Sequence, residues 1–239
     1  MEACIALENG FVLPGQLLGA PLPAGGEVVF HTGMTGYQEI LTDPSYAGQI
    51  VVFTASHIGN YGIHQGDHES AKIHPAGVIV RDFCRQNFHR GSERGLDQIL
   101  RQAGVPALAN VDTRALTVAI RNGGTCRGWI GTGNPEQLVQ KALALPHIAD
   151  IDWVGRVTTP RIVPYSRQPE SEEPFEVAVL DCGVKKSILG RLVDEGCRVR
   201  VFPAATPAAR LLEEPTEGVF LSNGPGDPAS HPEIGRAHV

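Results

Sequence analysis

The spacing of hydrophobic and polar positions changes repeatedly over residues 1–155, which predicts a mixture of short strands and helices. Apolar runs at 4–7 and 11–13 flank Asn9-Gly10, and Asn-Gly between such runs is the strongest short-range signal for a β-hairpin. Further apolar runs of strand length lie at 28–32, 50–55, 78–81 and 125–130.

Helices are expected in the same stretch of chain. Residues 92–103 place their apolar side chains on one helical face. Asp112 is a favourable N-cap for a second helix, which Gly123-Gly124 ends. A third helix is expected from Asn134-Pro135 to Leu143, with Asn as the cap and Pro at the first helical position. The pattern predicts an α+β domain and by itself indicates no function.

The pattern changes after residue 175. Continuous apolar runs at 176–180, 198–202 and 218–221 alternate with helical patterns around 188–193 and over 206–213. Strands that alternate with helices in this way predict a parallel α/β sheet. Three strands are too few to bury both faces of a parallel sheet, so this domain is expected to be incomplete.

A proline-rich segment separates the two patterns. Residues 156–174 contain Pro160, Pro164, Pro169 and Pro174, which prevent a helix and remove hydrogen-bond donors. The segment is therefore predicted to be a linker. The expected organisation is a domain at 1–155, the linker at 156–174 and a second domain at 175–239.

Composition narrows the classes of function. The 239 residues carry a formal net charge of -6, so the chain lacks the positive charge that binding to nucleic acid or anionic lipid requires. The five cysteines form no C-x-x-C pair, which argues against a structural zinc site and favours a reducing compartment. Residues 1–11 lack the basic start and long apolar core of a signal peptide, so a cytoplasmic location is expected.

The histidine cluster and Cys182 are weak candidates for a functional site. His57, His64, His68 and His74 cluster in sequence, but glycines and a proline interrupt any helix that would align them on a metal. They are interpreted as loop histidines, and no metal is expected. Cys182 follows an apolar strand, yet it lacks the small flanking residues of a nucleophile elbow and is interpreted as a buried structural cysteine.

The loop Asn223–Pro228 is the stronger candidate. It places two glycines and two prolines directly after an apolar strand, at the edge where open α/β sheets bind ligands. A rigid loop of this kind can direct backbone N–H groups at a developing oxyanion. A simple tight turn explains the same residues equally well.

The motif LSNGPGDP at 221–228 resembles the oxyanion loop of class I glutamine amidotransferases. Four motifs of the first half resemble a narrower family, the small subunit of carbamoyl-phosphate synthase. They are FHTGMTGYQEILTDPSY at 30–46, HIGNYG at 57–62, VRD at 80–82 and NVDTRALT at 110–117. The resemblance extends to about residue 234.

The resemblance implies a fold and an activity. The second domain would be an incomplete class I glutamine amidotransferase domain with a flavodoxin-like parallel sheet. Such a subunit hydrolyses L-glutamine and passes ammonia to a large subunit, which makes carbamoyl phosphate from bicarbonate and ATP for arginine and pyrimidine synthesis. Ser45, Gly224 and Gly226 match glutamine-binding positions of the family, with the Gly224 N–H a donor in the oxyanion hole. This chain would hold no cofactor, since ATP and Mg²⁺ or K⁺ belong to the large subunit.

The sequence also departs from the family pattern. The family's G-x-C-x-G-x-Q elbow and H-x-E pair would follow the last residue, and residues 234–239 do not resemble the family's next helix. The expectation is a C-terminally truncated chain that carries no catalytic residue and is inactive alone. Two alternatives stay open, namely an inert module that docks on the synthetase subunit and a subunit of another class I amidotransferase.

Overall fold

The computed structural model describes residues 1–213 and 215–230, so residues 234–239 lie outside the described part of the chain. Its contacts divide the chain into two compact units. Unit 1 consists of Met1–Thr42 and Gly48–Ile148, and unit 2 of Asp43–Ala47 and the residues from Ala149 onward. Over the described residues, no helix has the length and apolar character needed to cross a membrane.

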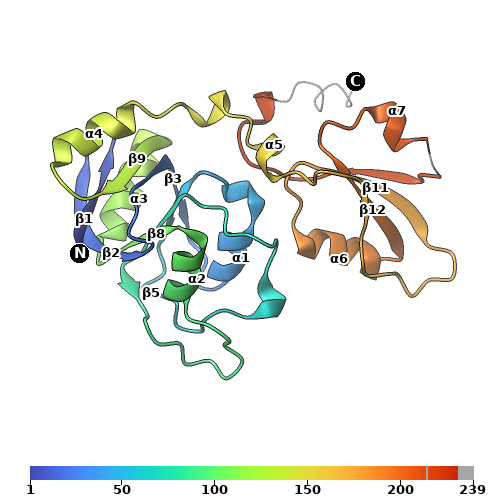
Figure 1. Cartoon of the computed structure of the whole chain (residues 1–239), viewed down its shortest axis with the longest axis horizontal. Helices are drawn as coiled ribbons and strands as arrows, with labels where there is room; N and C mark the ends of the chain where they lie inside the picture. Colours follow the sequence, from blue (N-terminus) through green and yellow to red (C-terminus); the bar gives the residue numbers. More distant parts are fainter. Residues whose placement is uncertain (214, 231–239) are drawn as a thin grey trace. The chain divides into compact units, whose positions relative to one another are not determined.

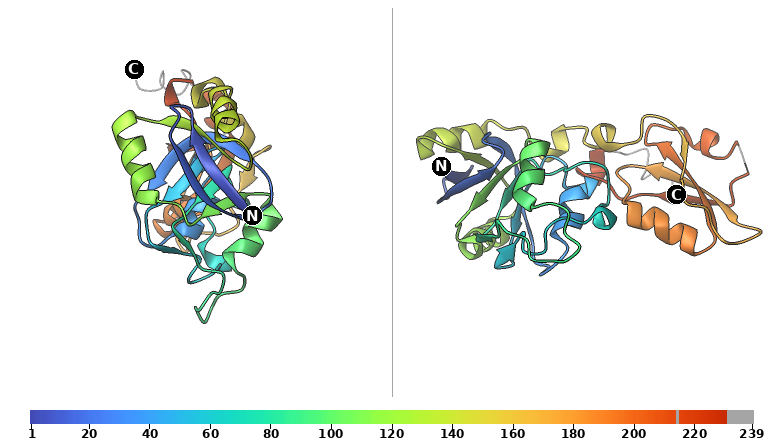
Figure 2. Two further views of the ribbon diagram at one scale, coloured as in Figure 1. Left: turned by 90° about the vertical axis from the view of Figure 1, so that its left-hand side faces the viewer. Right: turned by 60° about the horizontal axis from the view of Figure 1, so that its bottom comes forward.

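Unit 1 is built on a closed barrel with the strand order β1-β2-β8-β6-β4-β3-β9 (Figures 1 and 2). Its strands are β1 (Glu2–Leu7), β2 (Val12–Gly19), β3 (Ala24–His31), β4 (Ile50–Phe53), β6 (Gly77–Ile79), β8 (Pro106–Ala109) and β9 (Cys126–Gly131). The predicted hairpin is confirmed, because β1 and β2 pair antiparallel around Asn9-Gly10. β3, β4, β6 and β8 follow one another in parallel pairs. The α+β prediction therefore holds only coarsely, since it included neither β8 nor the closure of the barrel.

The barrel strands use their two faces for different neighbours. Ile5 and Leu7 of β1 join the main core cluster, against which α3 (Thr113–Gly123) also packs Leu116. Cys4 and Ala6 point to the other face and contact α4 (Pro135–Leu143). This alternation is the period of two that a strand imposes on its side chains.

The helix boundaries follow local capping. Asp112 accepts a hydrogen bond from the backbone N–H of Ala115, and Asn134 one from Glu136, so both predicted N-caps are confirmed. The first predicted helix is shorter than expected, since α2 covers Leu96–Ala103 only. Gly95 before it is extended, and Arg94 forms a β-bridge with Ile63, which holds residues 92–95 out of the helix.

A loop region completes unit 1. It contains α1 (Tyr37–Thr42), β5 (His57–Ile58), the 3-10 turn Gln65–Asp67 and β7 (Asp82–Phe83), with β5 and β7 forming a separate parallel pair. A further 3-10 turn, Ile148–Asp150, spans the boundary between the two units. The Tyr61 hydroxyl accepts hydrogen bonds from the N–H groups of Gly36 and Tyr37, at 2.8 and 3.0 Å, and thereby caps α1.

Glu8 and Arg127 form a half-buried ion pair beside the barrel. The Glu8 carboxylate accepts from the Arg127 backbone N–H and from its Nε, both at 2.7 Å. Burial acts to raise the pKa of Glu8, but the hydrogen bonds from Arg127 outweigh it and lower the pKa below its ordinary 4.5. The pair therefore stabilises the fold above about pH 4.5 and loses this effect as the pH falls further.

We expect Glu8→Gln to lower the free energy of unfolding by about 1–3 kcal/mol at neutral pH. The difference from wild type should shrink as the pH falls below 4.5, because the wild-type carboxylate then becomes protonated. Urea unfolding at neutral and acidic pH measures this, with Glu2→Gln at an exposed carboxylate as the control. A difference that is constant with pH would contradict it.

Unit 2 contains a four-stranded sheet with the order β10-β12-β11-β13 (Figure 1). The strands are β10 (Val163–Pro164), β11 (Phe175–Asp181), β12 (Cys197–Pro203) and β13 (Gly218–Leu221). β11 is parallel to both β12 and β13, as predicted. The helices are α5 (Val154–Val157), α6 (Lys186–Asp194) and α7 (Ala208–Leu211), with 3-10 turns at Pro44–Tyr46 and Pro228–Ser230.

Helices cover both faces of this sheet. Val177 and Val179 of β11 pack with Leu189 and Val193 of α6 on one face. Ala178 and Leu180 point to the other face, where they pack with Val154 of α5 and Leu211 of α7. This explains why β11 reads as a continuous apolar run rather than an alternating one.

The sheet differs from the predicted one at its edge. Val163-Pro164, inside the segment predicted as a linker, pairs antiparallel with β12 and makes the sheet mixed. Proline is compatible with an edge strand, since its missing donor need not face a neighbour. The helix expected over 206–213 is also shorter, because α7 spans Ala208–Leu211 alone.

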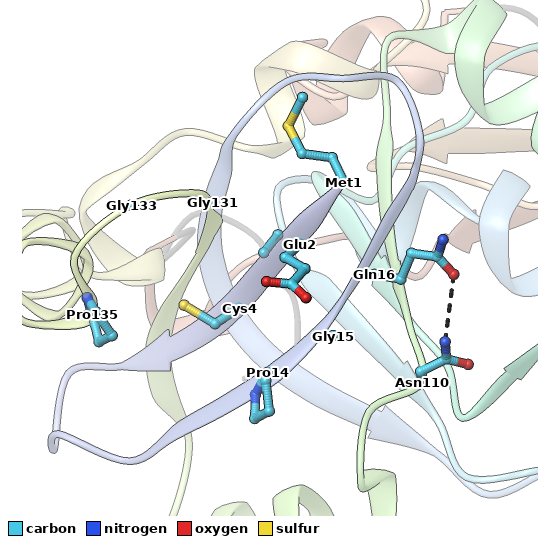
Figure 3. A pocket seen from close by; sticks show the side chains of 11 residues that line it. Met1, Glu2, Cys4, Pro14, Gly15, Gln16, Asn110, Gly131, Gly133 and Pro135 are labelled. Atoms are coloured by element: carbon cyan, nitrogen blue, oxygen red, sulfur yellow. Dashed lines mark hydrogen bonds between the residues drawn. The ribbon is translucent and has the colours of Figure 1, made fainter.

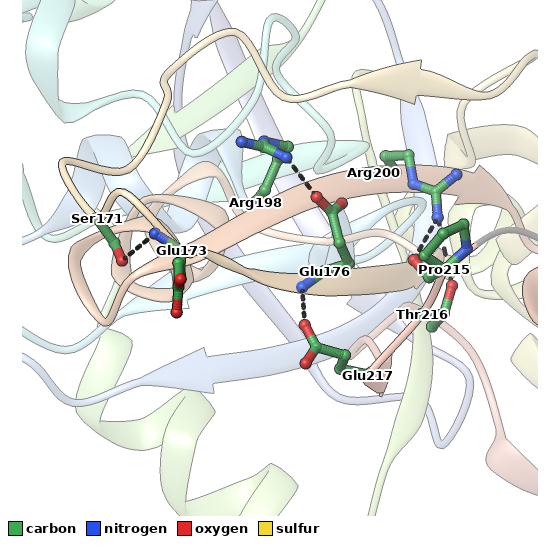
Figure 4. Close-up of polar contacts among 8 residues, drawn as sticks. All are labelled: Ser171, Glu173, Glu176, Arg198, Arg200, Pro215, Thr216 and Glu217. Carbon is green, nitrogen blue, oxygen red and sulfur yellow. Dashed lines mark hydrogen bonds and ion pairs between the residues drawn. The ribbon is translucent and has the colours of Figure 1, made fainter.

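Polar contacts fasten the amino ends of β11 and β13 (Figure 4). The N–H of Glu176 donates to Glu217 at 2.9 Å, and Arg198 pairs with the Glu176 carboxylate. Arg200 donates to the carbonyl of Pro215 and to Thr216 Oγ1, both at 3.3 Å. These contacts hold the turn into β13 and set its register against β11.

Candidate functional site

The candidate site lies at the carboxyl ends of two neighbouring parallel strands in unit 2. β11 and β13 pair in register up to Leu180 and Leu221. The turns that follow them, 181–185 and 222–226, therefore leave the same edge of the sheet. In open α/β sheets this edge is where ligands bind.

Asp181 organises the first turn. Its Oδ1 accepts hydrogen bonds from the N–H groups of Gly183 and Val184, at 2.9 and 2.8 Å, and its Oδ2 accepts from the N–H of Thr159 at 2.7 Å. The carboxylate is only 7% exposed, so these three backbone donors are its compensation for burial. The result is a fixed path for residues 181–184.

The second turn packs directly onto the first. Ser222 Oγ accepts from the N–H of Cys182 at 2.9 Å and donates to the carbonyl of Asn223 at 2.7 Å. A Cβ atom at Gly224 would overlap the carbonyl oxygen of Cys182, so only glycine fits there. Gly226 has φ +87°, a conformation that glycine adopts without strain.

Ser45 comes to this turn from a distant part of the sequence. Asp43 caps the 3-10 turn Pro44–Tyr46 by accepting from the Ser45 N–H at 2.9 Å. Asn223 Nδ2 donates to Ser45 Oγ at 2.8 Å and to the carbonyl oxygen of Gly183 at 3.3 Å. Burial, together with the charge of Asp43, raises the pKa of Tyr46, so its phenol stays neutral.

The structure thus gathers the residues that the sequence singled out. Ser45 contacts the loop that carries Gly224 and Gly226. Among the described residues, no acceptor is found for the N–H of Gly224. The glutamine-binding roles of these residues stay predictions.

Sequence reasoning included Asn223 in the candidate loop but missed its side-chain contact with Ser45, and it missed Asp181. Asp followed two residues later by Gly, directly after an apolar strand, is a recognisable signal for an Asx-turn. The contact from Asn223 to Ser45 spans 178 residues, and no local pattern encodes it.

The histidine cluster and Cys182, the two weaker candidate sites, have contacts that are typical of structural residues. His68 Nδ1 and the backbone of His64 hydrogen-bond the buried Gln38. In the described ranges, no three His, Cys, Asp or Glu side chains come together in a way that could hold a metal. Cys182 is 4% exposed within the α5–α7 face of the sheet, so its predicted burial is confirmed.

Unit 1 has an open cavity of about 880 Å³ beside β1 and β2 (Figure 3). Its polar lining includes Glu2, Gln16 and Asn110, and Asn110 Nδ2 donates to Gln16 Oε1 at 3.4 Å. Burial raises the pKa of the Cys4 thiol there, so that thiol is not an activated nucleophile.

Comparison with known proteins decides the family. The family model described as "Carbamoyl-phosphate synthase small chain, CPSase domain" matches residues 5–130. The chain belongs to the carbamoyl-phosphate synthase small-chain family. The model described as "Glutamine amidotransferase class-I" matches residues 178–238, so this family member combines both domains.

Similar curated proteins are named carbamoyl phosphate synthase small chain. That of Archaeoglobus fulgidus is 44% identical over 231 residues, which cover 96% of this chain and 63% of the relative. Those of Thioalkalivibrio sulfidiphilus and Thermosynechococcus vestitus are also 44% identical, over 95% of this chain and 63% of each relative. The chain therefore spans about 63% of the length of these curated relatives.

Proposed function

We propose that this chain provides part of the glutamine site of a glutamine-dependent carbamoyl-phosphate synthase. The proposal is supported by the hydrogen bond from Asn223 to Ser45, which brings the Ser45 hydroxyl to the loop that carries Gly224, at the edge where open α/β sheets bind ligands. Among the described residues, no acceptor is found for the Gly224 N–H. In this role Ser45, Gly224 and Gly226 bind L-glutamine, and the Gly224 N–H stabilises the oxyanion formed when a thiolate attacks the side-chain amide.

The sheet order is consistent with this role. β12-β11-β13 is the order 2-1-3 with which flavodoxin-like sheets begin. We propose that unit 2 is built on that plan, with β10 as an added antiparallel edge.

The wider activity is part of the same proposal. Ammonia released from glutamine passes to a large subunit, which binds ATP with Mg²⁺ or K⁺ and forms carbamoyl phosphate from bicarbonate for arginine and pyrimidine synthesis. We also propose that this chain has no glutaminase activity on its own. The match over residues 5–130 favours this role over a subunit of another class I amidotransferase.

Titration of the chain with L-glutamine, followed by saturation-transfer NMR, tests the site. We expect L-glutamine to bind and Ser45→Ala to weaken binding about tenfold, the usual effect of losing one good hydrogen bond to a ligand. L-glutamate serves as the ligand control. Equal signals from the two amino acids would contradict a glutamine site.

A second experiment separates catalysis from docking. We expect no glutamate release by the chain alone, and co-elution with a carbamoyl-phosphate synthase large chain on a sizing column. Clear turnover would refute the predicted inactivity, and the absence of a complex at micromolar concentration would count against the partner and against the docking-module alternative.

A further inference from the structure

The Asn223 side chain has two hydrogen-bonding partners that fix its orientation. One is the carbonyl oxygen of Gly183, 3.3 Å from Nδ2. A carbonyl oxygen can only accept a hydrogen bond, so the NH₂ end of the amide must face it. The other partner is Ser45 Oγ, 2.8 Å from the same Nδ2.

This orientation determines what the Ser45 hydroxyl can do. An amide NH₂ group can only donate hydrogen bonds, so Ser45 Oγ must accept the one from Asn223 Nδ2. The proton of the hydroxyl is then left to donate elsewhere. Among the described residues no acceptor for that proton is found, and Ser45 is half-buried with its own N–H already donated to Asp43.

We propose that Asn223 is a positioning residue that makes Ser45 a hydrogen-bond donor toward an oxygen atom of bound glutamine. The inference rests on the proposed function and adds to it the direction of the Ser45 contact. Without Asn223, a serine hydroxyl rotates freely and presents either its proton or its lone pairs. With Asn223 in place, the site selects a ligand that brings an oxygen to this point.

Asn223→Asp is the informative variant, since it keeps the shape and replaces Nδ2 by an acceptor. The Ser45 proton then turns toward the new carboxylate and is lost to the ligand. We expect glutamine binding to weaken about tenfold or more, as in Ser45→Ala. The double variant should bind no more weakly than Ser45→Ala alone, because both changes remove the same donor.

The matched control is Asn110→Asp, an exposed position in unit 1 where the amide makes one long contact to Gln16. It should leave glutamine binding unchanged. If the fold-losses in glutamine affinity caused by Asn223→Asp and by Ser45→Ala multiply in the double variant, the proposal is overturned and Asn223 has a general structural role. Wild-type binding by Asn223→Asp would overturn it as well.

A ligand-free measurement separates this inference from the proposed function. In ¹⁵N-resolved NMR of the full chain, Ser45→Ala should shift the side-chain NH₂ signals of Asn223 and speed their exchange with water. If wild type binds no glutamine but these signals shift, the ligand is wrong and the assigned direction of the hydroxyl stands. If the signals do not move, the direction of the hydroxyl is wrong whatever the chain binds.

Discussion

Gly224→Ala is expected to abolish glutamine binding and to lower the free energy of unfolding of unit 2 by about 2–4 kcal/mol. The added Cβ would overlap the Cys182 carbonyl oxygen and lie 3.0 Å from its carbonyl carbon. Both atoms belong to the peptide whose N–H, that of Gly183, donates to Asp181 Oδ1. The Cys182 carbonyl cannot shift without breaking hydrogen bonds. Loop 222–226 must therefore move away from Ser45 to relieve the overlap.

Two other glycines separate this clash from ordinary backbone strain. Gly226 and Gly10 both have φ +87°, but a Cβ at Gly226 would meet only Trp153 at 3.7 Å, and one at Gly10 would meet nothing within 4 Å. Alanine at either position should cost about 1–2 kcal/mol from the left-handed conformation. Urea unfolding and hydrogen exchange of the β11 and β13 amides measure the series. If Gly224→Ala is no less stable to urea than Gly10→Ala, the two turns are not tightly packed.

The sequence predicted those elements whose signals are local. The β1–β2 hairpin follows from Asn9-Gly10, and the starts of α3 and α4 follow from side chains that bond the next few N–H groups. β11 was predicted because both of its faces are buried, which leaves one continuous apolar run.

The features that were missed depend on partners far along the chain. β8 has the sequence Pro-Ala-Leu-Ala with no alternation, and it becomes a strand only because β2 and β6 pair with it and close the barrel. β10 was not predicted because it lies in a proline-rich segment, although proline is compatible with a strand at the edge of a sheet. Ser45 was predicted from resemblance alone, since its setting depends on Asn223 in a loop far along the chain.

Asp181→Asn is the second change with a large expected effect. The carboxylate has two acceptor oxygens that serve three backbone N–H groups, those of Gly183, Val184 and Thr159. An amide keeps one acceptor and turns an NH₂ group toward the remaining donor. Either Thr159 or the pair Gly183 and Val184 is then left unsatisfied, at 7% exposure of the side chain.

We therefore expect Asp181→Asn to lower the free energy of unfolding by about 2–4 kcal/mol, the range for unsatisfied donors in a buried site. Asp152→Asn is the matched control, because Asp152 is exposed and accepts from the single N–H of Gly155, which an Asn oxygen can also do. It should cost less than about 1 kcal/mol. Hydrogen exchange at the Gly183 amide should accelerate in Asp181→Asn alone. Glutamine binding should weaken with it, because the turn that Asp181 holds supplies the Gly183 carbonyl that orients Asn223. Equal stability of the two variants would mean that the turn keeps its path without the carboxylate, and that the site is organised from β13 instead.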